Sequence, residues 1–235
     1  ENLTDMAGQI SAQLDQFMWN HYHQLDMLKA ASSLVSDENY RTDSTLIKQL
    51  QDSFPSFSWV GVTDANGIVK ASSGDVLLDS DISARPVFIE GAKGDFIGDV
   101  HEALLLSELL PNPSGEPLRF VDISSPLYDK EGNFKGVLAA HLNWNWAQER
   151  VAMTADTFSD SKRMEVLVLS KDYDVLLGPN ELIGESLEQT MGPVIRSSER
   201  HWASITWPDK QKYLTGFSTS AGYDDYSGLG WTVVV

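Results

Sequence analysis

Histidine and carboxylate residues stand near the spacings of known metal sites, but each arrangement lacks a member. His101 and Glu102 begin like the helical motif of zinc proteases, yet Leu105 stands where the second histidine must lie one turn later. His21 and His23 are two residues apart, so a helix would point them to different faces. The sequence therefore predicts no metal site from these motifs.

Nucleophile, calcium and phosphate sites are incomplete in a similar way. The segment 216–220 lacks the second glycine of a nucleophile elbow, and the turn 64–67 offers too few oxygen ligands for a calcium loop. The chain has no cysteine, which removes thiolate metal sites and cysteine nucleophiles. We therefore expect this chain to be no enzyme and to use no cofactor.

Polar and aromatic residues in the first half of the chain instead predict a small-molecule cleft. Period-two alternation groups them on strand faces: Val137, Ala139, His141 and Asn143 on one strand, Phe120, Asp122 and Ser124 on another, and Phe57 and Trp59 on the first. A short helix would add Arg85 and Phe88. One cation, aromatic walls and a few polar groups are typical of a ligand pocket. Each residue could also be a satisfied core group or a surface charge.

Charge limits the partners. The chain has 17 Lys and Arg against 34 Asp and Glu, a net charge of −17. This excess repels phosphate, so we expect no nucleic-acid partner and no binding to anionic membrane surfaces. A small organic anion could bind only beside a local cation, and Arg85 is the candidate.

The predicted ligand is a small polar metabolite that carries a carboxylate. His141 would add a hydrogen-bond donor, and Asp122 would orient His141 or meet a donor on the ligand. Phe57, Trp59 and Phe88 would form the apolar wall. A cationic or neutral ligand, held mainly by Asp122 or Asp99, is the alternative.

Helices are predicted at the start of the chain. Apolar residues recur at threes and fours over 3–34, which predicts one long amphipathic helix. It could pack on a core, or also lead out of the domain toward a membrane. A second helix is predicted over 44–54, where Pro55 ends it.

Short β-type segments follow. The segments 58–63 and 68–71 predict a hairpin, with Asn66 and Gly67 in a type I′ turn. Strands are predicted over 96–101, 119–128 and 134–143, a short helix over 83–91 and a loop over 111–117.

The same pattern returns in the second half of the chain. The segments 166–170 and 175–177 repeat the first hairpin, with Thr63 aligned to Ser170, and strands over 213–219 and 230–235 repeat the later pair. The predicted fold is α+β, with two tandem modules built on antiparallel sheets. The predicted domains are a helical segment 1–55, a first module 56–145, a mostly helical connector 146–163 and a second module 164–235.

The order of these elements resembles the double Cache (PDC-type, PAS-like) extracytoplasmic sensor domain over nearly the whole chain. The segments that carry the resemblance are Asp81-Ile82-Ser83-Ala84-Arg85-Pro86-Val87-Phe88, Phe96-Ile97-Gly98-Asp99-Val100-His101, Ser125-Pro126-Leu127-Tyr128-Asp129-Lys130-Glu131-Gly132 before Gly136-Val137-Leu138, and Leu229-Gly230-Trp231-Thr232-Val233.

The resemblance implies a sensor in the periplasm or outside the cell, anchored in the inner membrane by flanking segments that are not in this chain. The implied output is the histidine kinase of a two-component system, with a diguanylate cyclase or a chemoreceptor as alternatives. A secreted enzyme and a passive binding module are alternatives of another class. We expect the chain to pair as a homodimer through the N-terminal helix, and ligand to bind in the first, membrane-distal module.

Amino-acid-binding members of the family hold their ligand with an Arg-x-Trp-Tyr motif, a later Tyr and an Asp. Here Arg85 matches the arginine and Phe88 the second aromatic, but Val87 replaces the tryptophan. Val100 falls at the later Tyr, and His141 stands where the Asp would bind an α-ammonium. The departure predicts a ligand other than an ordinary amino acid.

Overall fold

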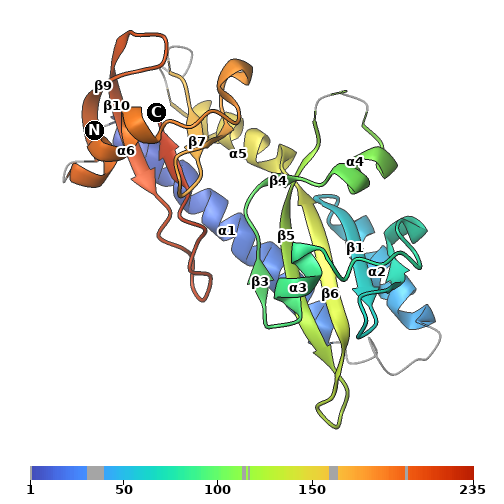
Figure 1. The fold of residues 1–235 in the computed structure, drawn as a ribbon. Helices are drawn as coiled ribbons and strands as arrows, with labels where there is room; N and C mark the ends of the chain where they lie inside the picture. The colour runs from blue at the N-terminus through green and yellow to red at the C-terminus, as the bar shows by residue number, and fades with distance from the viewer. Residues whose placement is uncertain (1, 31–39, 113–114, 116, 159–163, 199–200) are drawn as a thin grey trace. The chain divides into compact units, whose positions relative to one another are not determined.

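The computed structural model describes residues 2–30, 40–112, 115, 117–158, 164–198 and 201–235 (Figure 1). They form two compact units, described separately below. The first-sheet unit is His21–Trp144, and the second-sheet unit is Glu1–Asn20 with Asn145–Val235. The helix α1 (Asn2–Ala30) contributes residues to both. The boundaries predicted at residues 55, 145 and 163 stay predictions.

The two predicted N-terminal helices are present. In α1 the buried residues Met6, Ile10, Leu14 and Met18 follow the expected spacing. Its predicted extension to residue 34 lies outside the described residues. The second helix, α2 (Arg41–Ser53), stops before Pro55 as expected. Within the described part of the chain, no helix combines the length and the apolar composition that crossing a membrane requires.

The first-sheet unit contains an antiparallel sheet with the order β2-β1-β6-β5-β3, and β4 also pairs with β5. Its strands are β1 (Phe57–Thr63), β2 (Val69–Ser72), β3 (Phe96–Ile97), β4 (His101–Glu102), β5 (Arg119–Tyr128) and β6 (Phe134–Asn143). A short helix η1 (Ser73–Asp75) follows β2. The strand predicted over 96–101 is therefore two short strands.

One face of this sheet packs against a hydrophobic cluster that includes Trp59, Val87, Phe120 and Val137. The helix α3 (Pro86–Gly91) lies directly on the sheet, because a Cβ at Gly91 would come within 2.8 Å of Val137 Cγ1. A further helix on this side, α4 (Leu104–Leu109), was not predicted from the sequence. Its buried Leu106 belongs to the same cluster.

The C-terminal part of α1 is held to this unit by polar contacts. Nε2 of His21 lies 2.6 Å from Ser56 Oγ, and the Asp95 carboxylate accepts hydrogen bonds from Tyr22 Oη (3.0 Å) and Lys29 Nζ (3.1 Å). Burial alone would raise the pKa of Asp95, but hydrogen bonds from Ser125, Lys29 and Tyr22 outweigh it and lower that pKa.

The second-sheet unit repeats this architecture with the order β8-β7-β11-β10-β9, again antiparallel. Its strands are β7 (Leu167–Leu169), β8 (Val175–Leu177), β9 (Trp202–Thr206), β10 (Lys212–Thr219) and β11 (Thr232–Val234). Its other helices are α5 (Asn145–Ala155), η3 (Asn180–Leu182) and α6 (Glu188–Ser197). The predicted α+β fold with two antiparallel sheets is confirmed.

Two local predictions about the hairpins are wrong. Asn66 does not have the positive φ that a type I′ turn requires; φ is positive at Gly67, whose N–H donates to Asp64 O. The repeat is also displaced by one residue, because the counterpart of Ser170 is Asp64, not Thr63. Each of these two side chains accepts two backbone N–H groups within its own turn. An aspartate and a serine perform the same task here, so a match of residue types gave the wrong alignment.

The sequence analysis did not predict α6 and β9. Gly192 and Pro193 lie inside α6, and both residues disfavour a helix interior. The helix forms nevertheless, because Met191 and Ile195 are buried in the core of the second sheet. Tertiary packing thus outweighs local propensity.

Candidate functional site

The first-sheet unit contains a cavity of about 390 Å³ beside the buried face that carries Trp59 and Phe120. This volume is in the range of pockets for small metabolites. The lining residues come from β1, the segment 77–87, the segment 96–106, β5 and β6: Trp59, Leu77, Ile82, Arg85, Pro86, Val87, Phe96, Gly98, Asp99, His101, Glu102, Ala103, Leu106, Asp122 and His141.

Strand register brings three of these residues into one row. His141 on β6 pairs with Trp59 on β1 on one side and with Asp122 on β5 on the other. Directly paired residues point to the same face of a sheet, so all three side chains face the cavity. The predicted alternation along β5 and β6 is confirmed here.

Aromatic packing and one hydrogen bond hold this row. The Trp59 indole N–H donates to Val76 O at 2.9 Å, and the side chain is fully buried. The His141 ring lies 5.5 Å from Trp59 and 5.8 Å from Phe120, centroid to centroid. Such packing restricts the imidazole and presents its edge to the cavity.

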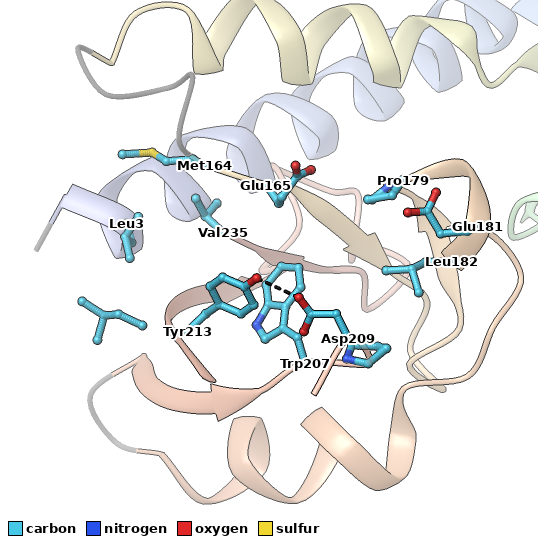
Figure 2. A pocket seen from close by; sticks show the side chains of 12 residues that line it. Leu3, Met164, Glu165, Pro179, Glu181, Leu182, Trp207, Asp209, Tyr213 and Val235 are labelled. Atoms are coloured by element: carbon cyan, nitrogen blue, oxygen red, sulfur yellow. Dashed lines mark hydrogen bonds between the residues drawn. The ribbon is translucent and has the colours of Figure 1, made fainter. Parts of the chain in front are cut away.

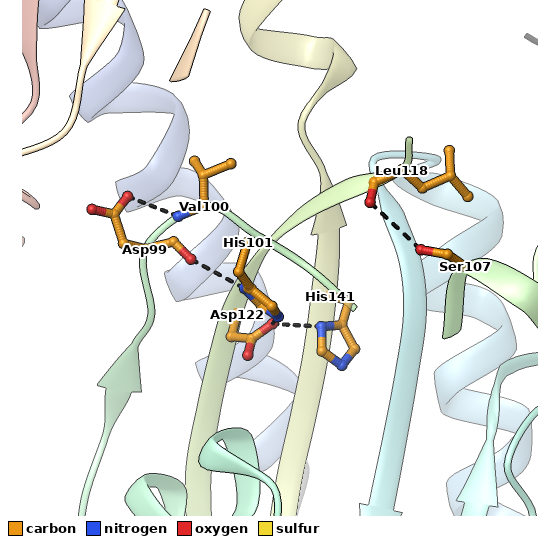
Figure 3. A network of polar contacts seen from close by, with 7 residues as sticks. All are labelled: Asp99, Val100, His101, Ser107, Leu118, Asp122 and His141. Carbon is orange, nitrogen blue, oxygen red and sulfur yellow. Dashed lines mark hydrogen bonds and ion pairs between the residues drawn. The ribbon is translucent and has the colours of Figure 1, made fainter. Parts of the chain in front are cut away.

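His141 and Asp122 form a close contact with a second histidine beside them (Figure 3). Nδ1 of His141 lies 2.5 Å from Asp122 Oδ1, and Nε2 of His101 lies 3.6 Å from the same oxygen. His101 reaches this position because β4 pairs with β5, placing His101 opposite Phe120. Its Nδ1 lies 3.1 Å from Asp99 O.

Arg85 lies at the N-terminal end of α3 and lines the cavity with an exposed side chain. No side-chain capping bond engages it at that helix end. Phe88 is one turn further along; it packs on the hydrophobic cluster and is not among the cavity-lining residues. Of the two candidates predicted from this helix, Arg85 therefore lines the cavity and Phe88 does not.

Phe57 does not share a face with Trp59, so the predicted pairing of these aromatics is wrong. The register of β1 against β6 shifts between them, and Phe57 pairs with Leu142. The bulge turns Phe57 to the opposite face, where its ring lies 5.2 Å from that of His21. Phe57 is therefore a core residue on the α1 side of the sheet.

Asn143 and Asp99 have backbone partners. The Asn143 side-chain amide donates to Ser56 O at 3.1 Å, and Asn143 is not among the cavity-lining residues. Asp99 does line the cavity, and its Oδ1 accepts the Val100 N–H at 2.7 Å. The structure thus brings Trp59, Arg85, Asp99, Asp122 and His141 together, without Phe57, Phe88 and Asn143.

The sequence analysis did not assign His101 to this site. In the sequence, His101 stands in an incomplete protease motif, in which a second histidine would lie one helical turn later. The partners lie on β5 and β6 instead. The alternation of His141 and Asp122 was visible in the sequence, but no local signal indicated that β4 would add a second imidazole.

Carboxylates outnumber permanent cations in the cavity wall. Asp99, Glu102 and Asp122 line it together with Arg85. Glu102 pairs in register with Arg119, whose pKa is lowered by burial and partly restored by Glu102. The wall therefore offers binding partners of both signs, with an excess of negative charge.

The second-sheet unit has a larger cavity, of about 660 Å³ (Figure 2). Its polar lining includes Glu165, Glu181 and Asp209, and Asp209 accepts a hydrogen bond from Tyr213 Oη at 2.7 Å. Trp207 supplies an aromatic wall. No arginine, lysine or histidine lines this cavity among the described residues.

Known proteins match this chain in structure. No protein-family model matches it. No curated protein matches its sequence either. An extracellular ligand-binding receptor from Desulfohalobium retbaense matches with a TM-score of 0.73 and 12% identity, over 99% of this chain and 39% of the other. This chain thus spans well under half of that receptor.

Two further matches cover most of both chains. The ligand-binding domain of the Campylobacter jejuni chemoreceptor Tlp3, solved with L-norvaline, has a TM-score of 0.70 and 14% identity, over 100% of this chain and 88% of the other. The extracellular domain of rpHK1S-Z16, described as a histidine kinase, has a TM-score of 0.69 and 15% identity, over 99% and 91%. At these identities the likeness shows the fold alone, an α+β fold with a long N-terminal helix and antiparallel sheets.

Proposed function

We propose that this chain is the extracytoplasmic small-molecule sensing domain of a transmembrane signalling receptor. The observation that carries the proposal is the first-sheet cavity, where Arg85, the His141–Asp122 contact and the buried Trp59 converge. The fold supports it, because the matching structures include sensory domains, one of them solved with L-norvaline.

The ligand we propose is a small polar metabolite with a carboxylate group. Arg85 is the permanent cation of the cavity wall and can bind a carboxylate with two parallel N–H groups. His141 offers an imidazole on the same cavity wall, and Trp59 provides an apolar surface. In a chain of net charge −17, this local cation is what would attract an anion.

A cationic or zwitterionic ligand, such as an amine or an amino acid, is the second candidate. The observation in its favour is that Asp99, Glu102 and Asp122 all line the same cavity. Asp122 lies directly across from His141, so a carboxylate is present one strand away from the position that the family motif assigns to an aspartate.

A thermal-shift screen of organic acids, amino acids, amines and nucleobases tests both candidates. A ligand at one hundred times its dissociation constant should stabilise the domain by about 2.7 kcal/mol. Arg85→Ala should abolish the shift caused by an acid. Lys93→Ala is the matched control, because Lys93 is a cation just beyond α3 that does not line the cavity. The carboxylate proposal fails if no acid raises the melting temperature, or if Arg85→Ala leaves the shift unchanged.

We further propose that the receptor lies in the inner membrane with this domain outside the cytoplasm, that its output is a histidine kinase, and that two chains pair along α1. A chemoreceptor output is the alternative favoured by the match to Tlp3. The flanking gene sequence tests the anchoring, since a receptor needs an apolar segment of about 20 residues on each side. Cross-links between cysteines introduced along α1 of the full-length receptor test the pairing. The pairing is contradicted if no position along α1 cross-links two chains.

A further inference from the structure

His101, Asp122 and His141 form a cluster of three metal-ligand side chains on three adjacent strands. Their ligand atoms all lie within 4.8 Å of one another. Ligands of a tetrahedral zinc ion at about 2.0–2.1 Å would be roughly 3.3 Å apart. Small side-chain rotations would therefore bring all three onto one ion.

The hydrogen bonding of His101 determines which of its nitrogens is available. Its Nδ1 contacts the backbone carbonyl oxygen of Asp99 at 3.1 Å, and a carbonyl can only accept. Nδ1 therefore carries the hydrogen, and in the neutral ring Nε2 has the free lone pair. This is the arrangement that orients metal-binding histidines in proteins, with the second nitrogen donating to a carbonyl or carboxylate.

Nε2 of His101 lies near a carboxylate oxygen. Nε2 lies 3.6 Å from Asp122 Oδ1, and two electron-rich atoms at that distance repel each other unless a proton or a cation lies between them. The same oxygen lies 2.5 Å from His141 Nδ1. One carboxylate oxygen thus faces two imidazole nitrogens.

Burial makes this arrangement costly without a further partner. Asp122 is 4% exposed and His141 is 8% exposed, and neither Asp122 Oδ1 nor His141 Nδ1 has a hydrogen bond of ordinary geometry. Apart from their contact with each other, both atoms lack the partners that nearly all buried polar atoms have, and a missing ion or water explains such a gap. Both residues line the cavity.

We propose that His101, Asp122 and His141 bind a divalent transition-metal ion such as Zn²⁺ or Ni²⁺. Two imidazoles and one carboxylate suit these ions, whereas Ca²⁺ and Mg²⁺ prefer six or more oxygen ligands. Asp99 and Glu102 in the same wall add negative charge that favours a dication. Three protein ligands leave an open position toward the cavity, where a carboxylate of a small molecule could coordinate.

The alternative is a metal-free ion pair in which a protonated His141 donates to Asp122. That arrangement accounts for His141, but a neutral His101 offers Asp122 no hydrogen, because its Nδ1 hydrogen is directed to Asp99 O. A metal ion satisfies all three side chains. The proposal goes beyond the ligand class proposed above, and a test with metal alone can fail or succeed independently of the organic-acid screen.

Calorimetric titration of the tag-free, chelator-treated 235-residue chain with ZnCl₂ or NiCl₂ tests the proposal. We expect one ion per chain. His101→Ala, Asp122→Asn and His141→Ala should each weaken binding by at least about tenfold, the loss that follows even from removing an outer partner of a metal ligand. With Co²⁺, visible absorption should show nitrogen and oxygen ligands without a thiolate band, because the chain has no cysteine.

His201→Asn is the matched control. His201 is an exposed imidazole outside the cluster, and asparagine tolerates its positive φ of 57°. This variant should bind metal like the parent chain. His101→Ala removes a half-buried side chain at a strand edge, so circular dichroism should confirm that the variant folds. The proposal is overturned if Zn²⁺ and Ni²⁺ bind more weakly than about 1 mM. It is also overturned if His101→Ala and Asp122→Asn bind as tightly as His201→Asn.

Discussion

The two sheets have the same strand order, but corresponding positions carry different chemistry. In the first sheet Gly61 pairs with Ala139, and Ala139 pairs with Ser124. In the second sheet the equivalent row is Leu167, Val234 and Phe217. Trp59 and Glu165 correspond to each other, because each lies two residues before the first residue of its row. Asp122 and Thr215 correspond in the same way, because each lies two residues before the last residue of its row.

Thr215 and Asp122 are buried polar residues at corresponding positions, and they differ in whether the protein itself provides their hydrogen-bond partner. The Thr215 hydroxyl accepts the Trp207 indole N–H at 3.0 Å and contacts Tyr213 O at 3.4 Å. The protein itself therefore satisfies this buried group. Asp122 Oδ1, in contrast, has no ordinary hydrogen bond. The same fold satisfies a buried polar side chain in one sheet and leaves a buried carboxylate oxygen without an ordinary hydrogen bond in the other.

The largest expected effect concerns the first correspondence. Trp59 is fully buried and Glu165 is exposed, although each lies two residues before the first residue of its row. Trp59→Ala should lower the free energy of unfolding by about 3–5 kcal/mol, because a large cavity remains. Glu165→Ala should change it by less than about 0.5 kcal/mol. Urea denaturation measures both. Equal losses would contradict the difference in burial between these two positions.

The next prediction tests how closely α3 approaches the first sheet. A Cβ at Gly91 would lie 2.5 Å from Ser124 Oγ, whereas a Cβ at Gly94 would meet no atom within 4 Å. Gly91→Ala should therefore cost about 1–3 kcal/mol by overpacking. It should also weaken any ligand that needs Arg85, since α3 must move. Gly94→Ala is the control and should not destabilise the domain. A thermal melt distinguishes the two variants.

The pKa values of two aspartates that join α1 to other segments, Asp15 and Asp95, are shifted in opposite directions. Asp15, in the second-sheet unit, accepts hydrogen bonds from Ser220 Oγ (2.6 Å) and Gly222 N (3.0 Å). Burial raises its pKa, and these hydrogen bonds offset only part of the rise. For Asp95, in the first-sheet unit, hydrogen bonds outweigh burial and the pKa is lowered.

The sign of each pH effect follows from linkage. A raised folded pKa stabilises fully below the unfolded pKa of about 3.9, and the effect is lost as pH rises through the folded pKa. The stability advantage of the parent over Asp15→Asn should therefore shrink as pH rises above about 4. For Asp95→Asn it should shrink as pH falls below about 4, and only slightly, because the Asp95 side chain is 42% exposed. Urea denaturation across this range would contradict the assignment if both variants changed in the same direction.

The smallest effects are expected at exposed ion pairs of corresponding helices. Arg196 and Glu188 on α6 make two N–H···O contacts, at 2.9 and 3.1 Å, while Lys93 and Glu90 near α3 make one at 2.7 Å. Glu188→Gln should cost less than about 1 kcal/mol, and Glu90→Gln less again. Added salt should reduce both differences. A larger loss for Glu90→Gln would contradict this order.

Local patterns in the sequence determined most of the elements near the site. Apolar residues spaced three and four positions apart predicted α1. Period-two alternation correctly placed Val137, Ala139 and His141 on one strand face. These patterns are readable because side-chain direction within a helix or a regular strand repeats with a constant period. The doubling of the module was visible for the same reason, since each half repeats a similar succession of strands and turns.

The tertiary structure decided which of these residues meet. The bulge between Phe57 and Trp59 turns the Phe57 side chain to the opposite face of the sheet, and no residue type in that segment indicates the bulge. His101 joins Asp122 and His141 because β4 pairs with β5 across many intervening residues. Register between distant strands depends on packing of the whole sheet, so local periodicity does not contain it. The sequence by itself thus determined the fold and one polar face, whereas the constellation of two histidines and one aspartate came from strand pairing alone.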